Sequence, residues 1–390
     1  MMDFAELSRE IVTILRGDAG IFNRKTVESA LQDFKPVTVS TWEFAERDAH
    51  RSVKVERTVD PVPAQTLHDL SLLHGVSVQR NVPLTPAYVP QDPMLGEQWA
   101  LRQMGADVAW DCLKTVPVTR ITIAIVDSGI ARTHPDLHGR THPRSKRFVV
   151  NPPDHHIDDE DGHGTSLAGT IAAVTDNPVG VASATWPFIV RVLAQKFYDP
   201  WNELTGDRAA RAIVDAVDEG ARVINLSWHV GLESALLYDA IEYADLHDVL
   251  VVTAAGNEGT NNDELPIWPA SYSDPAYGLT NVVSVMATNR HDDKPGYSNY
   301  GRRSVDLAAP GHGILSTHYY LANPQYREYS GTSAAAAHVT AAATLVRALR
   351  PGWTAPHVKQ YLRTVVDANA FLDCVARGRL NLARAVCPLV

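Results

Sequence analysis

The sequence predicts an α/β protein with a mostly parallel sheet and helices on both faces, preceded by a small α+β domain. Three observations lead to this fold class. From about residue 95 onward, apolar runs rich in β-branched residues alternate with helical stretches. These runs are almost continuously apolar, as strands are when both faces of a parallel sheet are covered. The chain before residue 80 has a different pattern, and a proline-rich segment divides the two parts.

Residues 1–80 form the predicted small α+β domain. The segment 2–16 has apolar residues at helical spacing, which predicts a helix. Residues 51–59 alternate valine with charged residues, as a half-buried strand does. The expected order is α-α-β-β-α-β, with helices over 2–16, 25–34 and 64–73 and strands over 36–44, 51–59 and 76–80. The segment 81–94 contains four prolines and no periodicity, so it is predicted to be a linker.

Residues 95–390 form the predicted α/β domain. Its expected strands cover 119–126, 147–150, 188–193, 221–227, 249–255 and 281–287. Helices are expected between them, over 164–174, 207–219, 233–247 and 333–349. Apolar strands that alternate with helices in this way indicate a parallel sheet that is covered on both faces.

The charge balance bears on possible partners. The chain has 35 Lys and Arg residues against 45 Asp and Glu residues, which gives a net charge of −10. No basic patch or tail is evident, so neither nucleic acid nor an anionic membrane is expected as a partner. The uncharged stretch 329–346 is interrupted by Ser, Thr and His residues, which makes it a poor membrane span.

The beginning of the chain and the cysteines bear on its location. The first thirty residues carry several charges and no apolar run typical of a signal peptide, so a cytoplasmic location is expected, with export by another route left open. Three cysteines are too few for a disulfide framework. Free thiols are therefore expected, although Cys374 and Cys387 could pair in an exported protein.

Reactive side chains follow the predicted strands and precede two predicted helices. Asp127 follows the strand 119–126, and Asn257 follows the strand 249–255. His163 and Ser333 each lie at the start of a helix, between glycines or other small residues. Because the carboxyl ends of parallel strands meet at one edge of a sheet, we expect these side chains to converge.

The four residues have the chemistry that acyl transfer requires. A serine at a helix start has an accessible hydroxyl, but it needs a base to become a nucleophile. His163 can supply that base, and Asp127 can orient the imidazole. Asn257 on a rigid strand end can donate a hydrogen bond to an oxyanion. Together they supply a nucleophile, a base, an orienting group and an oxyanion donor.

Four sequence blocks resemble the signature blocks of the subtilisin-like serine proteases, the subtilases. They are DSG at 127–129, DGHGTSLAGT at 161–170, AAGNEG at 254–259 and SGTSAAAAHV at 330–339, in that family's order. The resemblance extends over about residues 93–390. It implies a subtilisin-like fold and a serine endopeptidase that acts on polypeptides through an acyl-enzyme.

The same resemblance implies a role for each residue. Asp127 orients His163, which acts first as general base and then as general acid. Ser333 attacks the scissile carbonyl, and Asn257 forms the oxyanion hole with the Ser333 backbone N–H. No cofactor is needed for this chemistry. The alternative is a catalytically silent subtilase fold that acts as a binding or scaffold protein.

The resemblance also points to substrate-binding residues. Where the family commonly has Ser-Leu-Gly-Gly, this chain has the segment Ser227, Trp228, His229, Val230 and Gly231. These bulkier side chains are expected to narrow the pocket for the residue before the cleaved bond. Glu258, next to Asn257, is expected to favour a basic side chain there, unless it is only a solvated carboxylate at the rim.

Subtilases often bind structural calcium, and the resemblance suggests where this chain could do so. Asp136 matches a typical ligand position, and the loop 174–181 resembles the family's calcium loop, with Asp176 or Asn177 as a ligand. Gln98 could complete the site. The alternative interpretation of this loop is a tight Asn-Pro turn.

The N-terminal domain has two interpretations. It resembles the small propeptide of subtilases, which docks on the catalytic domain as an inhibitor and folding aid. In that case Ser333 is expected to cut the chain between about 81 and 95. The alternative is a permanent regulatory domain.

Overall fold

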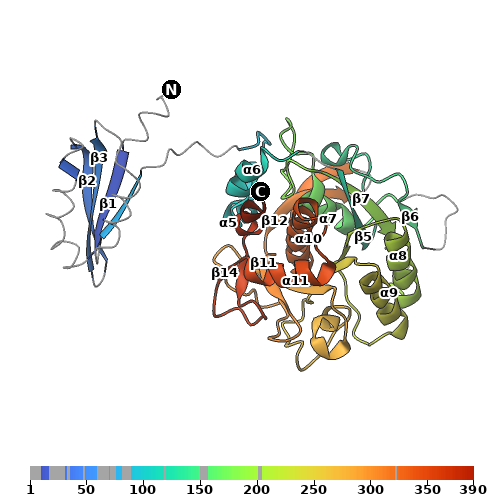
Figure 1. The fold of residues 1–390 in the computed structure, drawn as a ribbon. Coiled ribbons are helices and arrows are strands. Elements are labelled where there is room, and N and C mark those ends of the chain that lie inside the picture. Colours follow the sequence, from blue (N-terminus) through green and yellow to red (C-terminus); the bar gives the residue numbers. More distant parts are fainter. Residues whose placement is uncertain are drawn as a thin grey trace. The chain divides into compact units, whose positions relative to one another are not determined.

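The computed structural model describes residues 10–16, 31–32, 36–46, 49–58, 70, 76–80, 89–117, 120–149, 157–200, 204–320 and 323–390. The chain divides into two compact units, Met1–Pro86 and Ala87–Val390, which we name the N-terminal unit and the C-terminal unit. Figure 1 shows the ribbon of both.

The N-terminal unit contains a four-stranded antiparallel sheet with the strand order β2-β3-β1-β4. Residues 31–32 and residue 70 are helical, and both Leu31 and Leu70 are buried. The strands are β1 (Glu10–Arg16), β2 (Pro36–Glu46), β3 (Ala49–Thr58) and β4 (Val76–Arg80).

The helix predicted over residues 2–16 is wrong where the structure describes the chain, because residues 10–16 form strand β1. The stretch Ile11–Ile14 consists of four consecutive β-branched residues, which favour a strand. Strand β1 also pairs with β3 on one side and β4 on the other, so pairing outweighed the helical spacing. Residues 1–9 lie outside the described part, as does 81–88 of the predicted linker.

The rest of the predicted linker packs on the C-terminal unit. The backbone N–H of Met94 donates to the carbonyl of Gly180 at 2.8 Å, and the side chain of Asp92 is buried. Residues 89–94 therefore belong structurally to the C-terminal unit.

The C-terminal unit is built on a nine-stranded sheet with the order β14-β15-β11-β10-β9-β8-β5-β7-β6. Every neighbouring pair is parallel except β14 and β15. The strands are β5 (Arg120–Asp127), β6 (Lys146–Arg147), β7 (Ile189–Lys196), β8 (Val223–Leu226), β9 (Leu250–Ala254), β10 (Val282–Thr288), β11 (Leu307–Pro310), β14 (Val366–Ala368) and β15 (Gly378–Leu380). Strand β6 has only two residues, whereas a strand was predicted over 147–150, of which residue 150 lies outside the described part.

Helices surround this sheet, and a separate hairpin lies against one of them. The α-helices are α5 (Trp99–Gln103), α6 (Ala106–Leu113), α7 (His163–Ala172), α8 (Gly206–Asp218), α9 (Ala235–Leu246), α10 (Thr332–Leu349), α11 (Ala355–Thr364) and α12 (Leu382–Val386). Short 3₁₀ helices are η1 (Leu95–Glu97), η2 (Pro135–Leu137), η3 (Ala270–Ser273), η4 (Pro275–Tyr277) and η5 (Cys387–Leu389). The hairpin of β12 (Ile314–Tyr320) and β13 (Asn323–Tyr329) packs on α7.

Alternate residues of β5 enter two separate hydrophobic clusters. Ile123 and Ile125 belong to the cluster that includes α7 and α10, whereas Ala124 and Val126 belong to the cluster that includes α8 and α9. Successive side chains of a strand point to opposite faces, so helices cover both faces of the sheet, as predicted. Helices α8 and α9 lie side by side on one of these faces (Figure 1). Asp127, the next residue in the alternation, belongs to the α7–α10 face.

A disulfide joins Cys112 in α6 to Cys387 after α12, with the two Cα atoms 5.4 Å apart. The expectation of free thiols is therefore wrong for these two residues. The alternative pairing of Cys374 with Cys387 is also wrong, because Cys374 is a buried free thiol. Helices α6 and α12 pack against each other, a contact that the spacing of cysteines in a sequence cannot reveal.

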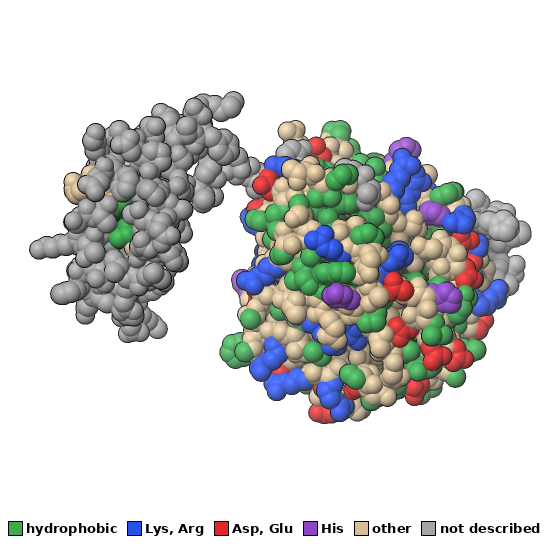
Figure 2. All heavy atoms as spheres, viewed as in Figure 1, with side chains coloured by type: hydrophobic (Ala, Val, Ile, Leu, Met, Phe, Trp, Pro, Cys, Tyr) green, Lys and Arg blue, Asp and Glu red, His purple; other side chains and the backbone are tan. Residues whose placement is uncertain are grey.

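The surface of the C-terminal unit is mixed in charge. Figure 2 shows acidic and basic side chains interspersed over the visible face. Among the described residues, no helix has both the length and the apolar character needed to cross a membrane.

Candidate active site

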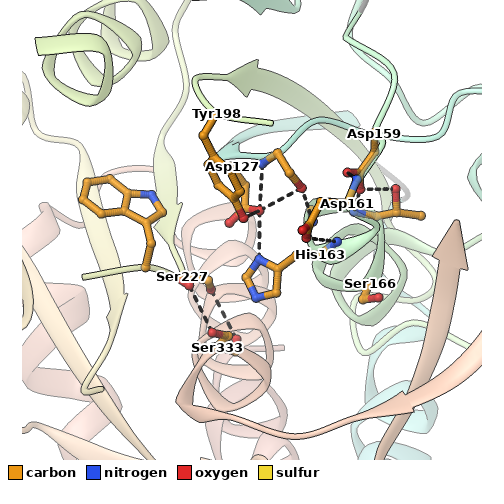
Figure 3. Close-up of polar contacts among 12 residues, drawn as sticks. Asp127, Asp159, Asp161, His163, Ser166, Tyr198, Ser227 and Ser333 are labelled. Atoms are coloured by element: carbon orange, nitrogen blue, oxygen red, sulfur yellow. Dashed lines mark hydrogen bonds and ion pairs between the residues drawn. The ribbon is translucent and has the colours of Figure 1, made fainter. Parts of the chain in front are cut away.

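Three elements bring Asp127, His163 and Ser333 to the same edge of the sheet. Asp127 is the last residue of β5, His163 is the first residue of α7, and Ser333 is the second residue of α10. Nδ1 of His163 lies 2.8 Å from Oδ1 of Asp127. Figure 3 shows the imidazole between the carboxylate and Ser333. The sequence blocks are thus close in space although they lie far apart in the chain.

The Asp127 carboxylate is fully buried and receives its hydrogen bonds on one oxygen. Oδ1 accepts from the Ser128 backbone N–H at 2.8 Å, from the Ser128 hydroxyl at 3.2 Å and from the Tyr198 hydroxyl at 3.1 Å, besides its contact with His163. Oδ2 is buried and accepts no hydrogen bond from the described residues. The orientation of this carboxylate is therefore set by the donors at Oδ1.

A second carboxylate organises the start of α7. Asp159 is fully buried and accepts from the backbone N–H groups of Gly162 at 2.8 Å and Thr165 at 2.8 Å, and from the Thr165 hydroxyl at 2.6 Å. The first N–H groups of a helix have no partner within the helix, so these bonds cap it. Gly162 has φ +91° and lies so near the Tyr319 carbonyl that a Cβ would clash at 2.6 Å. Asp159 and Gly162 together fix where α7 begins and therefore where His163 lies.

The environment of His163 favours its protonated form. Burial acts against the charged imidazolium, but the attraction and hydrogen bond of Asp127 and the charges of Asp161 and Asp159 outweigh it, which raises the pKa of His163 to about 9. Its side chain is 27% exposed, so solvent and substrate can reach the ring. The neutral imidazole, which is the form that can accept a proton, becomes available as the pH rises toward that value.

The hydroxyl of Ser333 lies at the start of a buried helix, and the residue itself is only 7% exposed. Its Oγ donates to the backbone carbonyl of Ser227 at 3.0 Å, and among the described residues no hydrogen bond joins it to His163. The backbone N–H of Ser333 lies in the first turn of α10, where helical N–H groups have no internal acceptor. Both the oxygen and the nitrogen of this residue can therefore serve a reacting carbonyl.

Asn257 is held beside Ser333 by the neighbouring threonine. Its Oδ1 accepts from the Thr332 backbone N–H at 2.9 Å and from the Thr332 hydroxyl at 3.1 Å. Because the oxygen faces these donors, the amide nitrogen faces away from them, and it makes no hydrogen bond to the described residues. Asn257 is exposed, so its N–H groups can reach a substrate oxygen.

Comparison with known proteins identifies the family. The sequence profile of the subtilase family matches residues 119–378. The chain belongs to this family. Thermitase of Thermoactinomyces vulgaris is 35% identical over 301 residues, which cover 77% of this chain and 99% of thermitase. An alkaline protease of Shouchella clausii is 28% identical over 359 residues, 88% of this chain and 87% of that protein. This subtilase is accordingly a serine endopeptidase that acts on polypeptides, as the sequence blocks predicted.

Solved structures agree with this fold. A protease of Pseudoalteromonas arctica superposes with a TM-score of 0.67 and 26% identity, and the match covers 78% of this chain and all of the other. The epidermin leader peptide processing serine protease of Staphylococcus aureus superposes with a TM-score of 0.64 over 96% of this chain and 97% of its own. At 19% identity, the second likeness concerns the fold alone.

Two of the predicted substrate-binding residues of this subtilase, Ser227 and Trp228, lie between Ser333 and an apolar cavity. The Ser227 hydroxyl donates to the Ser333 carbonyl at 3.3 Å, so the end of β8 adjoins Ser333. The Trp228 indole donates to the Val126 carbonyl at 2.8 Å and packs against Phe197. Trp228 and Phe197 line a cavity of about 180 Å³.

The other three predicted substrate-binding residues are differently placed. Nε2 of His229 lies 3.0 Å from Oε1 of Glu258. The second oxygen of Glu258 accepts from the Asn257 backbone N–H at 3.0 Å and from the Asn299 amide at 3.0 Å. Both carboxylate oxygens of Glu258 are therefore engaged. Gly231 is exposed beyond this pair.

A second cavity, of about 460 Å³, lies on the other side of His163, between the start of α7 and the β12–β13 hairpin. Its wall includes Asp161, His318, Arg327 and Glu328. The imidazole thus has open space on the side away from Ser227. This cavity was not predicted from the sequence, because the hairpin that forms part of its wall was not predicted.

The predicted metal-ligating residues are only partly together. Oδ1 of Asp136 accepts from the Asn177 amide at 2.9 Å, and Oδ2 accepts from the Val181 N–H at 2.8 Å. Gln98 instead exchanges two hydrogen bonds of 2.8 Å with the backbone of Ala182. Asp176 turns its Oδ1 toward the backbone N–H of Gln91 at 3.2 Å, away from Asp136.

Asp92, which belongs to the predicted linker 81–94, lies beside this group. One of its oxygens accepts from the Asp176 N–H at 2.8 Å, and the other is buried without a hydrogen bond from the described residues. Burial raises the pKa of Asp92, and the nearby charge of Asp136 adds to the increase. Burial also raises the pKa of Asp136. Buried carboxylates whose charged form is disfavoured are suited to a hard cation.

Proposed function

We propose that this serine endopeptidase hydrolyses peptide bonds through Asp127, His163 and Ser333. Nε2 of His163 takes the Ser333 hydroxyl proton while Oγ attacks the scissile carbonyl carbon. His163 then donates that proton to the departing amine, which leaves an acyl-enzyme on Ser333. Water attacks the acyl-enzyme by the same proton transfers in reverse. Asp127 keeps Nε2 directed at the serine and stabilises the imidazolium.

We propose that the amide of Asn257 and the backbone N–H of Ser333 stabilise the oxyanion of both tetrahedral intermediates. The hydrogen bonds from Thr332 to Asn257 support this role, because they fix the amide before the substrate arrives. The observation that carries the whole proposal is the 2.8 Å contact of His163 with buried Asp127 at the edge of the sheet where α10 presents Ser333.

Labelling with a serine-directed fluorophosphonate tests these roles. Wild type is expected to react, and Ser333→Ala and His163→Ala are expected to lose both labelling and peptide hydrolysis. Ser145→Ala, which changes a half-buried serine before β6, is the matched control and is expected to react normally. Labelling that survives in Ser333→Ala would refute the assignment of Ser333, whereas a wild type that is neither labelled nor hydrolyses peptides would favour the alternative of a catalytically silent fold.

We propose that the N-terminal unit acts as a propeptide that docks on the C-terminal unit and is cut off by Ser333 between about residues 81 and 95. The alternative remains a permanent regulatory domain. Intact masses of wild type and Ser333→Ala, expressed side by side, decide between them. Identical masses would argue against self-processing.

We propose that substrate chains lie along Ser227, Trp228 and His229. Trp228 supports an apolar contact, because it lines the 180 Å³ cavity. Glu258 can favour a basic residue before the cleaved bond only if its carboxylate releases His229 and binds the basic side chain of the substrate instead. Sequencing of peptides released from a proteome tests this, and no enrichment of Arg or Lys before the cut would remove the preference.

We propose that calcium binds beside the loop 174–181, with the carboxylates of Asp92 and Asp136 as side-chain ligands. The unpartnered oxygen of buried Asp92 supports this site. A divalent cation there would offset the two carboxylate charges and stabilise the loop, without a part in the chemistry. The side chains of Gln98 and Asp176 hydrogen-bond to backbone groups, so we do not include these two residues among the calcium ligands.

The location in the cell remains a prediction. The disulfide of Cys112 with Cys387 favours an oxidising compartment, which weighs against the cytoplasmic location expected from the sequence.

A further inference from the structure

The side chain of Tyr198 touches the proposed catalytic carboxylate from outside the signature blocks. Tyr198 lies just after β7, the strand that pairs with β5 up to Asp127 itself. Its hydroxyl donates to Oδ1 of Asp127 at 3.1 Å, and Figure 3 shows it on the opposite side of the carboxylate from His163. The proposed triad thus has a further hydrogen-bond donor.

Aromatic packing fixes the direction of this tyrosine. Its ring meets Phe197 edge-on, with the centroids 5.1 Å apart. Phe197 is fully buried and packs in turn on Trp228, with the centroids 5.0 Å apart. Since the Trp228 indole is bonded to the Val126 carbonyl, the residue before Asp127, the aromatic group is tied to the same strand end. Tyr198 therefore has little freedom to turn its hydroxyl elsewhere.

The uneven bonding of Asp127 makes this donor important. All its hydrogen bonds from the described residues arrive at Oδ1, whereas Oδ2 has none. The hydrogen bonds that resist rotation of this buried carboxylate about its Cβ–Cγ bond, among the described residues, are therefore those at Oδ1. The hydrogen bonds from Ser128 and Tyr198 supply that resistance. The contact with His163 is not counted, because His163 is the group that the carboxylate has to align.

We propose that Tyr198 is a positioning residue of the proposed triad: it holds the Asp127 carboxylate in the plane that meets His163 and takes up part of its negative charge. This rests on the proposed function. Burial and the charge of Asp127 raise the pKa of Tyr198 far above its ordinary value, so the hydroxyl remains a donor at every working pH. Without that bond, the carboxylate attracts the imidazolium more strongly and holds the ring less exactly in place.

Other charged groups also face His163, and the test has to leave them in place. Those on the α7 side are Asp159 and Asp161, and those on the wall of the neighbouring cavity are His318, Arg327 and Glu328. Replacement of Tyr198 by phenylalanine changes none of them. A shift in the titration of His163 in that variant is therefore assigned to the lost hydroxyl.

The experiment compares Tyr198→Phe with Tyr238→Phe. Tyr238 is also half-buried in the α8–α9 cluster and also loses one hydrogen bond, of 3.0 Å to the Tyr277 carbonyl, but it lies on α9 away from the triad. In Tyr198→Phe, kcat for a peptide substrate is expected to fall about two- to tenfold with little change in KM. The acid limb of its pH profile is expected to move to higher pH. Tyr238→Phe is expected to match wild type in both.

A second readout does not depend on turnover. The far-downfield proton resonance of the His163 Nδ1–H, assigned by its absence in His163→Ala, reports the titration of the imidazole directly. If wild type proves inactive, the proposed function fails, whereas a raised imidazole pKa in Tyr198→Phe still supports the positioning role. If the titration and kcat of Tyr198→Phe equal those of Tyr238→Phe, even with a lower melting temperature, the hydroxyl is merely structural and the proposal is overturned.

Discussion

The acidic surroundings of His163 predict an enzyme that works best in alkaline solution. With a pKa of about 9, roughly one imidazole in a hundred is neutral at about pH 7, and about half are neutral at about pH 9. Because only the neutral ring can act as the base, kcat/KM is expected to rise about 50-fold over this range. Part of the raised pKa comes from Asp161, whose exposed side chain also accepts from the His163 backbone N–H at 3.2 Å.

The variant Asp161→Asn isolates that charge, because its amide oxygen can still accept the same hydrogen bond. The pKa of His163 is expected to fall, so the acid limb of kcat/KM moves to lower pH. An exposed charge contributes about 0.2–1 kcal/mol, which corresponds to an increase in kcat/KM of about 1.4- to fivefold near neutral pH and none on the alkaline plateau.

Steady-state hydrolysis of a peptide across the pH range measures both effects. Asp239→Asn, which removes an exposed carboxylate on α9, is the control and is expected to leave the limb in place. Added salt is expected to shrink the difference between Asp161→Asn and wild type, because it screens exposed charges. An acid limb in Asp161→Asn at the same pH as wild type, or higher, would show that this carboxylate does not set the basicity of His163.

Three further changes have defined outcomes. Cys112→Ser removes a cross-link that closes a loop of 275 residues, so the free energy of unfolding is expected to fall by about 2–5 kcal/mol, and reductant is expected to lower the melting temperature of wild type only. His229→Ala frees Glu258, so cleavage after Arg and Lys is expected to increase relative to wild type, and the increase is expected to vanish in His229→Ala/Glu258→Gln. A chelator is expected to remove about 2.7 kcal/mol of stability from wild type held at roughly 100 times the calcium Kd, and none from Asp92→Asn.

Each of these results has a clear opposite. A reductant that lowers the melting temperature of Cys112→Ser as much as that of wild type would remove the stabilising role of the bond. An unchanged cleavage profile in His229→Ala would show that His229 does not shield Glu258. A melting temperature of wild type that ignores the chelator would count against the calcium site.

The central sheet was predictable because its strands are buried on both faces. In the run 119–126 the last six residues are apolar except Thr122, which indicates β5, and Asp127 ends the run at its carboxyl end. The start of α10 was equally clear from Gly331 and the alanines that follow Ser333. Local sequence thus located the residues that the structure brings together.

Features that depend on tertiary contacts were not predictable in the same way. The segment 10–16 satisfies a helical spacing but forms the central strand β1, because pairing on both sides decides its state. Tyr198 gives no signal in the sequence, since its importance depends on the pairing of β7 with β5. Asp92 was assigned to a linker, although residues 89–94 pack on the C-terminal unit.

The bond between Cys112 and Cys387 encloses every residue of the proposed triad within one covalent loop. A molecule nicked once by a neighbouring copy, anywhere inside that loop, keeps both fragments attached and its folded core in place. Self-digestion would then be invisible on a gel run without reductant and would appear as discrete fragments once the bond is reduced. Molecules that have been cut in this way can therefore remain active.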